Sequence, residues 1–153
     1  MPAERAYPPD ISPDVYKALG GAEMAIKASG LDPALIELVK MRASQINGCA
    51  YCLDMHSRDA RRRGETEQRL YLLNAWRESS LYSGAERAAL AWTEALTGLA
   101  HAHPGEQAYQ DLLPHFSPKA IVDLTALVGM INLWNRLAIG LRYIHPVDKT
   151  AAA

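Results

Sequence analysis

Apolar side chains recur every three or four residues along most of this chain of 153 residues. That period is typical of helices with one buried face, because an α-helix has about 3.6 residues per turn. No segment of useful length alternates apolar and polar residues, and no hairpin turn separates two β-branched runs. The pattern therefore predicts an all-α protein.

Residues that start and stop helices divide the chain into expected elements. Ser12, Asp32 and Ser117 each precede a proline, Ser83 begins a capping-box pattern, and Gly48 follows asparagine at a turn. The expected helices span residues 13–29, 33–47, 49–63, 67–78, 84–99, 106–113 and 118–143. Residues 1–11 hold three prolines and are expected to form an irregular arm. We therefore predict one domain over residues 1–153 with six or seven helices.

Composition narrows the function classes. Apolar residues make up 49% and charged residues 22% of the chain, and its net charge is −1. Such a balance is typical of a globular domain and gives no field that would attract nucleic acid or a membrane surface. Three adjacent arginines, 61–63, are too few to change this, and they suit a helix C-terminus.

Two further features bear on location. The N-terminal residues lack the apolar run of a signal peptide, so we expect a cytoplasmic protein. The most apolar run, residues 120–141, is interrupted by Asp123, Asn132, Asn135 and Arg136. We interpret it as a buried helix rather than a membrane span, with Trp134 packed inside and with Asn132 and Arg136 making capping or interface hydrogen bonds.

The candidate chemistry lies in the stretch from Cys49 to His56. It holds the two cysteines of the chain at C-x-x-C spacing, and a histidine follows four residues later. On a helix, Cys49, Cys52 and His56 share one face. The turn at Gly48 places Cys49 in the first turn of a new helix, where free N–H groups and the helix dipole favour a thiolate. Tyr51 is expected to line a substrate entrance or to pack at an interface.

Several interpretations of this motif are open. Zinc could bind to Cys49, Cys52 and His56, with Glu37 or water as the fourth ligand, but a second cysteine pair is lacking. Covalent haem is excluded because Leu53, not histidine, follows the second cysteine. The cysteines could also be small buried apolar residues. The last interpretation is a thiol redox centre, in which one thiolate reacts and the other resolves the product.

The two thiols and Glu37 have roles that spacing alone leaves open. The helix dipole and exposure favour Cys49 as the more acidic thiol, whereas proximity to His56, a possible base, favours Cys52. Glu37 sits among apolar residues, where burial would raise its carboxyl pKa and suit it to pass protons. Periodicity also fits Glu37 on the solvent side of its helix.

The residues Glu37, Cys49, Cys52 and His56 have the spacing E-x11-C-x2-C-x3-H. This pattern resembles that of the alkylhydroperoxidase D (AhpD) family, within the carboxymuconolactone decarboxylase-like superfamily. The stretches 41–52 and 131–136 are similar to that family as well, and the likeness covers roughly residues 15–145. The decarboxylases of the superfamily lack this cysteine pair as a rule.

The resemblance implies an AhpD-like helical bundle, assembled as a homo-oligomer, a trimer or hexamer. It implies thiol-dependent reduction of hydroperoxides, with Cys52 as the peroxidatic thiol, Cys49 as the resolving thiol, and His56 and Glu37 as a proton relay. No cofactor or metal is expected, and an external dithiol, such as a lipoyl group or a thioredoxin-like protein, would supply electrons. The alternatives are a general dithiol–disulfide oxidoreductase and a non-enzymatic oligomer that senses redox state or holds zinc.

Overall fold

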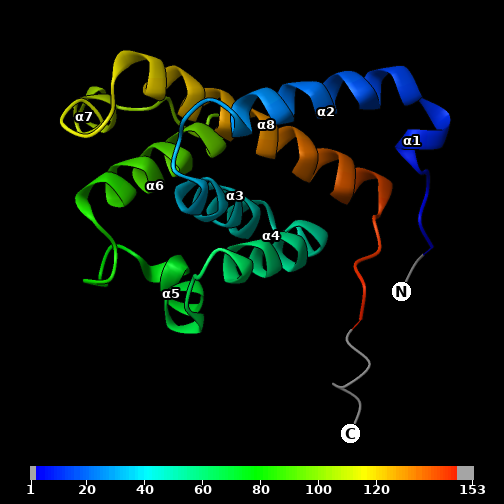
Figure 1. The fold of residues 1–153 in the computed structure, drawn as a ribbon, viewed down its shortest axis with the longest axis horizontal. Helices are drawn as coiled ribbons and strands as arrows, with labels where there is room; N and C mark the ends of the chain where they lie inside the picture. The colour runs from blue at the N-terminus through cyan, green and yellow to red at the C-terminus, as the bar shows by residue number, and fades with distance from the viewer. Residues whose placement is uncertain (1–2, 148–153) are drawn as a thin grey trace, which may run out of the picture.

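The computed structural model describes residues 3–147, and every regular element in that range is a helix (Figure 1). The α-helices are α1 (Pro8–Ile11), α2 (Pro13–Lys27), α3 (Pro33–Asn47), α4 (Ala50–Arg62), α5 (Glu67–Leu72), α6 (Gly84–Thr97), α7 (Glu106–Gln110) and α8 (Pro118–Leu141). A 3-10 turn at Leu73–Ala75 follows α5. The prediction of an all-α fold is confirmed.

Most helix starts follow the predicted capping residues. The side chain of Asp32 accepts a hydrogen bond from Ala34 N, and the side chain of Ser117 accepts one from Ala120 N at the start of α8. Ser83 and Glu86 form the complete capping box at the start of α6. These interactions are local, which explains why the sequence predicted them correctly.

Several expectations were wrong in detail. Residues 3–147 form eight α-helices rather than six or seven, and the helix expected over 106–113 ends at Gln110. The arm predicted to be irregular contains the four-residue helix α1. The side chain of Ser12 makes no capping hydrogen bond at the start of α2. The helix expected over 67–78 ends at Leu72 and continues only as the 3-10 turn, and the buried Trp76 that follows donates its indole N–H to Glu94 of α6.

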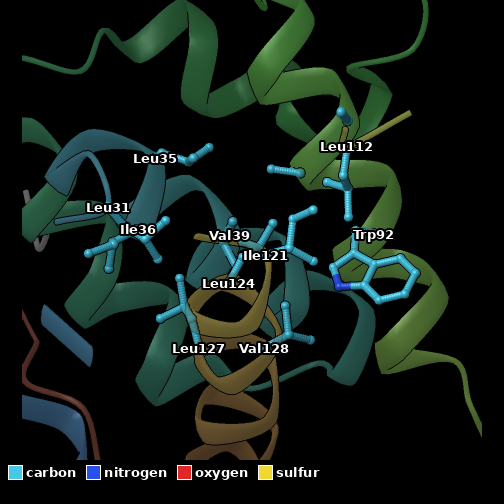
Figure 2. Packing of buried hydrophobic residues seen from close by; sticks show 12 residues of the cluster. Leu31, Leu35, Ile36, Val39, Trp92, Leu112, Ile121, Leu124, Leu127 and Val128 are labelled. Carbon is cyan, nitrogen blue, oxygen red and sulfur yellow. The ribbon is translucent and has the colours of Figure 1, made fainter. Parts of the chain in front are cut away.

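Helix α3 is the centre of the molecule and packs against α4, α6 and α8. Residues 35–41 of this helix are all buried, so apolar side chains leave it in every direction. Figure 2 shows one side of the resulting core, where Val39 of α3 meets Leu124 and Leu127 of α8, with Trp92 of α6 beside them. Burial of such side chains contributes about 1.5–3 kcal/mol each. Polar residues in this part of α3 are therefore held inside the protein.

Helix α8 is long and apolar enough to cross a membrane by length and composition alone. Its residues Ile121, Leu124, Leu127 and Val128 instead form part of the core cluster shared with α3 and α6. The N-terminal arm is tied to its far end, where Arg5 N donates to Leu141 O at 3.0 Å. One side of α8 is therefore buried in the core of the protein, as predicted for this segment.

Two residues, Gly48 and the N-cap Cys49, join α3 to α4, and Gly48 makes the turn. Its φ of 69° and ψ of 35° lie in the left-handed region, which suits glycine. The turn is closed by hydrogen bonds from Gly48 N to Gln45 O (3.3 Å) and from Cys49 N to Ser44 O (3.0 Å). This tight joint brings α4 back against α3 and fixes the position at which Cys49 begins the next helix.

Replacing Gly48 with alanine is expected to lower the free energy of unfolding by about 1–2 kcal/mol, because a Cβ is strained in the left-handed region. Gly20→Ala is the matched control. Gly20 lies inside α2 with nothing within 4 Å of an added Cβ, so this change is expected to stabilise by about 0.5–1 kcal/mol. Urea unfolding of both variants tests the prediction, and equal effects at the two positions would contradict it.

Candidate active site

The two cysteines lie at the start of α4. Cys49 is the N-cap residue, and its Sγ accepts a hydrogen bond from Cys52 N at 3.4 Å. Both thiols are free and buried, with relative exposures of 1% for Cys49 and 2% for Cys52. The expectation that exposure distinguishes Cys49 was therefore wrong. The expected position at the helix start was correct.

The two thiols differ in acidity. The pKa of Cys49 falls from its ordinary value to about 7, chiefly because the Cys52 thiol donates a hydrogen bond to it. Burial opposes this shift, while the backbone N–H of Cys52 and the side-chain amide of Asn135 assist it. The pKa of Cys52 is raised because its proton is held by Cys49 and because it is buried. Cys49 is therefore the more acidic thiol and the first of the two to lose its proton, as the helix position predicted.

Access from the cavity favours Cys52 as the thiol that meets a substrate. A cavity of about 220 Å³ opens between α2, α4 and α8, and Cys52 and His56 are among its lining residues. Cys49 lies behind them and does not line the cavity. A small molecule in the cavity would therefore contact Cys52, although Cys49 is the more acidic thiol.

Glu37 and His56 form a buried pair between α3 and α4. The carboxylate Oε2 and the imidazole Nδ1 are 2.8 Å apart, and the residues are 2% and 5% exposed. A carboxylate can only accept this hydrogen bond, so Nδ1 carries the proton and Nε2 is left to exchange one. The structure thus brings together two of the predicted relay residues. The interpretation that placed Glu37 on the solvent side was wrong.

The expected rise in the pKa of Glu37 was also wrong. Burial does act to raise it, but the hydrogen bond from His56 and the nearby charges of His56, Lys40 and Arg63 outweigh burial and lower the pKa. The guanidinium Nε of Arg63 lies 3.8 Å from Glu37 Oε1. Glu37 is therefore an ionised carboxylate that orients His56 rather than a neutral acid.

Sequence reasoning missed a second buried ion pair beside the cavity. Lys40, 1% exposed, binds Glu23 of α2, and Trp134 Nε1 donates to the same carboxylate at 3.2 Å. Lys40 lies one helical turn after Glu37, so two charged residues share a buried stretch of α3. That spacing was the available signal, because a buried lysine requires a partner.

Asn135 was missed as well. It is 1% exposed on α8, donates to Ser44 Oγ at 3.0 Å, and accepts from Asn47 Nδ2 at 2.8 Å. Its amide also lowers the pKa of both cysteine thiols. The signal was an amide on an otherwise apolar helix. Asn132 lies nearby and donates to Thr97 Oγ1 within the same chain, which agrees with a hydrogen-bonding role.

Aromatic side chains form much of the cavity wall. Tyr16 of α2 packs edge-on against Trp134 of α8, with ring centroids 5.6 Å apart, and Tyr51 packs edge-on against Tyr143 at 5.3 Å. All four line the cavity together with Met55. Trp134 thus packs as predicted, and Tyr51 lies at the cavity, one of its two expected positions.

The structure does not bring Cys49 and Cys52 together with His56 and Glu37 as a zinc site. Within residues 3–147, the three potential ligand atoms that lie within 4.8 Å of one another belong to Glu37, His56 and Asp59. Neither cysteine belongs to this group. Since Glu37 already faces the cations Lys40 and Arg63, its charge is largely balanced without a metal.

A helical bundle that places a buried Glu–His pair beside a C-x-x-C motif defines an AhpD-like protein. The chain belongs to the carboxymuconolactone decarboxylase family, whose model matches residues 13–95. That range contains the whole motif from Glu37 to His56.

Individual relatives agree with this assignment. The uncharacterized protein YdfG of Bacillus subtilis is 40% identical over 132 residues, which cover 86% of this chain and 90% of YdfG. The crystal structure of ATU0492 from Agrobacterium tumefaciens, a protein of unknown function proposed as the antioxidant defence protein AhpD, has a TM-score of 0.92 and 42% identity, covering 95% of this chain and all of that one. The debrominase Bmp8 has a TM-score of 0.80 and 25% identity, covering 90% and 74%.

Removing the thiol of Cys52 tests the hydrogen bond between the two thiols. Cys52→Ala is expected to raise the pKa of Cys49 above 7 towards its ordinary value of 9.0, because the hydrogen bond that stabilises the thiolate is lost. Cys52→Ser keeps a donor and is the matched control, with a smaller rise. The ultraviolet absorbance of the thiolate, followed against pH, measures both. An unchanged Cys49 pKa in Cys52→Ala would show that the two sulfurs are not coupled.

Neutralising Glu37 tests the buried ion pair. The folded-state pKa lies below the ordinary 4.5, so the ionised carboxylate stabilises the fold above that pH, and this contribution is lost as pH falls through the folded pKa. Glu37→Gln is expected to lower the free energy of unfolding by about 3 kcal/mol at neutral pH. The deficit relative to wild type should shrink in acid.

The control for this experiment is Asp123→Asn. Asp123 pairs with the exposed Lys119 on the surface of α8, so its loss is expected to cost less than about 1 kcal/mol. Denaturant unfolding at several pH values provides the measurement. A Glu37→Gln deficit that does not depend on pH would mean that packing, rather than charge, is what Glu37 contributes.

Proposed function

We propose that this protein is a thiol-dependent peroxidase that reduces organic hydroperoxides with the pair Cys49 and Cys52. One observation carries the proposal: the carboxylate of Glu37 holds the imidazole of His56 at 2.8 Å, beside a cavity that Cys52 also lines. A thiol, an oriented base and a binding space lined in part by aromatic side chains therefore meet at one point. Similarity to AhpD-like proteins supports the same reaction class.

The first step uses Cys52, because it faces the cavity. The resting charge lies on Cys49, but one shared proton separates the two sulfurs, and its shift from Cys52 to Cys49 places the thiolate at the cavity. His56, oriented by Glu37, accepts the proton that the pair gives up. The Cys52 thiolate attacks the terminal oxygen of the hydroperoxide. An S–O bond forms, the O–O bond breaks, and the alkoxide leaves as alcohol with the proton from His56.

In the second step, Cys49 resolves the sulfenic acid of Cys52. Cys49 carries the proton that it received from Cys52 in the first step. Its sulfur attacks the Cys52 sulfur, that proton leaves with the hydroxide as water, and a disulfide forms. Both residues lie at the start of α4, so they are close in space from the start. Access suits Cys52 to the peroxidatic role, and the neighbouring Cys49 suits the resolving role.

An external dithiol would restore the pair by exchange, and a lipoyl group or a thioredoxin-like protein fits this role chemically. The proposal needs no metal or cofactor. Assembly into a trimer or hexamer and a cytoplasmic location remain predictions. The debrominase Bmp8 shares the fold, so family membership alone does not fix the substrate.

Substituting each cysteine tests the assignment of roles. Cys52→Ser is expected to abolish consumption of tert-butyl hydroperoxide in the presence of a dithiol, because the attacking sulfur is gone. Cys49→Ser is expected to consume about one equivalent and then stall, because the sulfenic acid can form but cannot be resolved. Peroxide loss and mass spectrometry of the oxidised residue are the measurements. Full turnover by Cys52→Ser would disprove the assignment.

The wild-type protein and these variants also distinguish the alternative functions. A general dithiol–disulfide oxidoreductase would reduce disulfides faster than hydroperoxides, and the acidic Cys49 thiol suits that reaction too. A non-enzymatic redox sensor would change its assembly with oxidation but show no turnover. Rates for a hydroperoxide and a model disulfide, measured beside the oligomer size of each redox form, distinguish all three.

A further inference from the structure

The end of α8 has a strained backbone. Within residues 3–147, Arg142 is the one residue other than glycine with a positive φ, at 59°. This conformation turns the chain so that Tyr143 N donates to Ala138 O at 2.9 Å. Left-handed conformations of such residues cost about 1–3 kcal/mol and are common at functional sites. This strained turn sets the position of Tyr143.

The turn directs Tyr143 back to the cysteines. Its ring packs against the cluster formed by Cys49, Cys52 and Ala138, and it meets Tyr51 edge-on. Tyr143 also lines the cavity that Cys52 and His56 line. It thus reaches the candidate active site from a part of the chain far from the C-x-x-C motif.

The hydroxyl group of Tyr143 has no partner in the part of the chain that the structure describes. It is the one buried side-chain polar atom among residues 3–147 without a hydrogen bond. Such a group costs about 1–3 kcal/mol. Burial, with the nearby Tyr16, Glu4 and Tyr51, raises the pKa of Tyr143 to about 12. The hydroxyl therefore stays protonated at neutral pH and remains a hydrogen-bond donor.

We propose that the Tyr143 hydroxyl donates a hydrogen bond to the oxygen that leaves when Cys52 attacks a hydroperoxide in the cavity. This inference rests on the proposed peroxidase function. As the S–O bond forms and the O–O bond breaks, the electron pair of the broken bond passes to the alkoxide oxygen. The hydrogen bond stabilises that charge, the proton comes from His56, and Tyr143 keeps its own proton. The observations behind this role are that Tyr143 lines the cavity with Cys52 and that its hydroxyl has no other partner among residues 3–147. Hydrogen-bond donors that meet a developing oxyanion are effective catalytic groups.

The variant Tyr143→Phe removes only this oxygen. Oxidation of Cys52 by cumene hydroperoxide, followed in a single turnover, is expected to slow on the order of 100-fold. Alkylation of the same sulfur by iodoacetamide is expected to keep its rate, because no alkoxide leaves in that reaction. The control is Tyr71→Phe at an exposed tyrosine of α5, which should change neither rate. Unchanged oxidation in Tyr143→Phe, or an equal loss in both reactions, would overturn the proposal.

A second measurement separates this inference from the proposed function. In Cys49→Ser protein, Cys52 can be converted to a thiocyanate, which places a nitrile acceptor in the cavity. The nitrile stretching frequency is expected to shift when Tyr143→Phe removes the donor, and to stay unchanged with Tyr71→Phe. If wild-type protein fails to react with hydroperoxide but the nitrile shift is present, the peroxidase function is wrong and the donor role of Tyr143 stands. Identical nitrile frequencies overturn the role of Tyr143, whatever the peroxidase result.

Discussion

The hydrogen bond between Glu37 and His56 is the interaction on which the site depends. A carboxylate that is 2% exposed cannot remain ionised unless positive groups and hydrogen bonds surround it. That requirement holds α4 against α3 and brings Lys40 and Arg63 near the same carboxylate. It also fixes the orientation of the imidazole. The structure therefore links the stability of the central helix pair to the chemistry beside it.

The two cysteines differ in acidity and in access to the cavity: Cys49 is the more acidic thiol, and Cys52 lines the cavity. Cys49 is acidic because it caps a helix and accepts hydrogen bonds from its neighbour Cys52, and that same position buries it behind the cavity. Cys52 can meet a substrate, but in the resting protein it holds the shared proton. A base close to the pair is then necessary for reaction, which explains why an oriented histidine occupies the next turn of α4.

Local interactions made much of the fold predictable. The bounds of α3, the capping box at Ser83 and the turn at Gly48 depend on neighbours in the sequence, and all were predicted correctly. The motif residues were found for the same reason. The burial and low pKa of Glu37 were not predictable, because they depend on cations and on packing against α4. Asn135 and Tyr143 were missed because distant segments bring them to the cysteines.

The tight turn at Gly48 places the Glu37 carboxylate, His56 and both sulfurs within a single helical hairpin, residues 33–62. Four aromatic residues line the cavity around them: Tyr16, Tyr51, Trp134 and Tyr143. Of these, Tyr51 lies within the hairpin and the other three lie outside it. Mutations can therefore reshape the substrate space without disturbing the reacting groups. Under the proposed mechanism, substitutions in this cavity wall can change which molecules enter the cavity while the reacting groups stay in place.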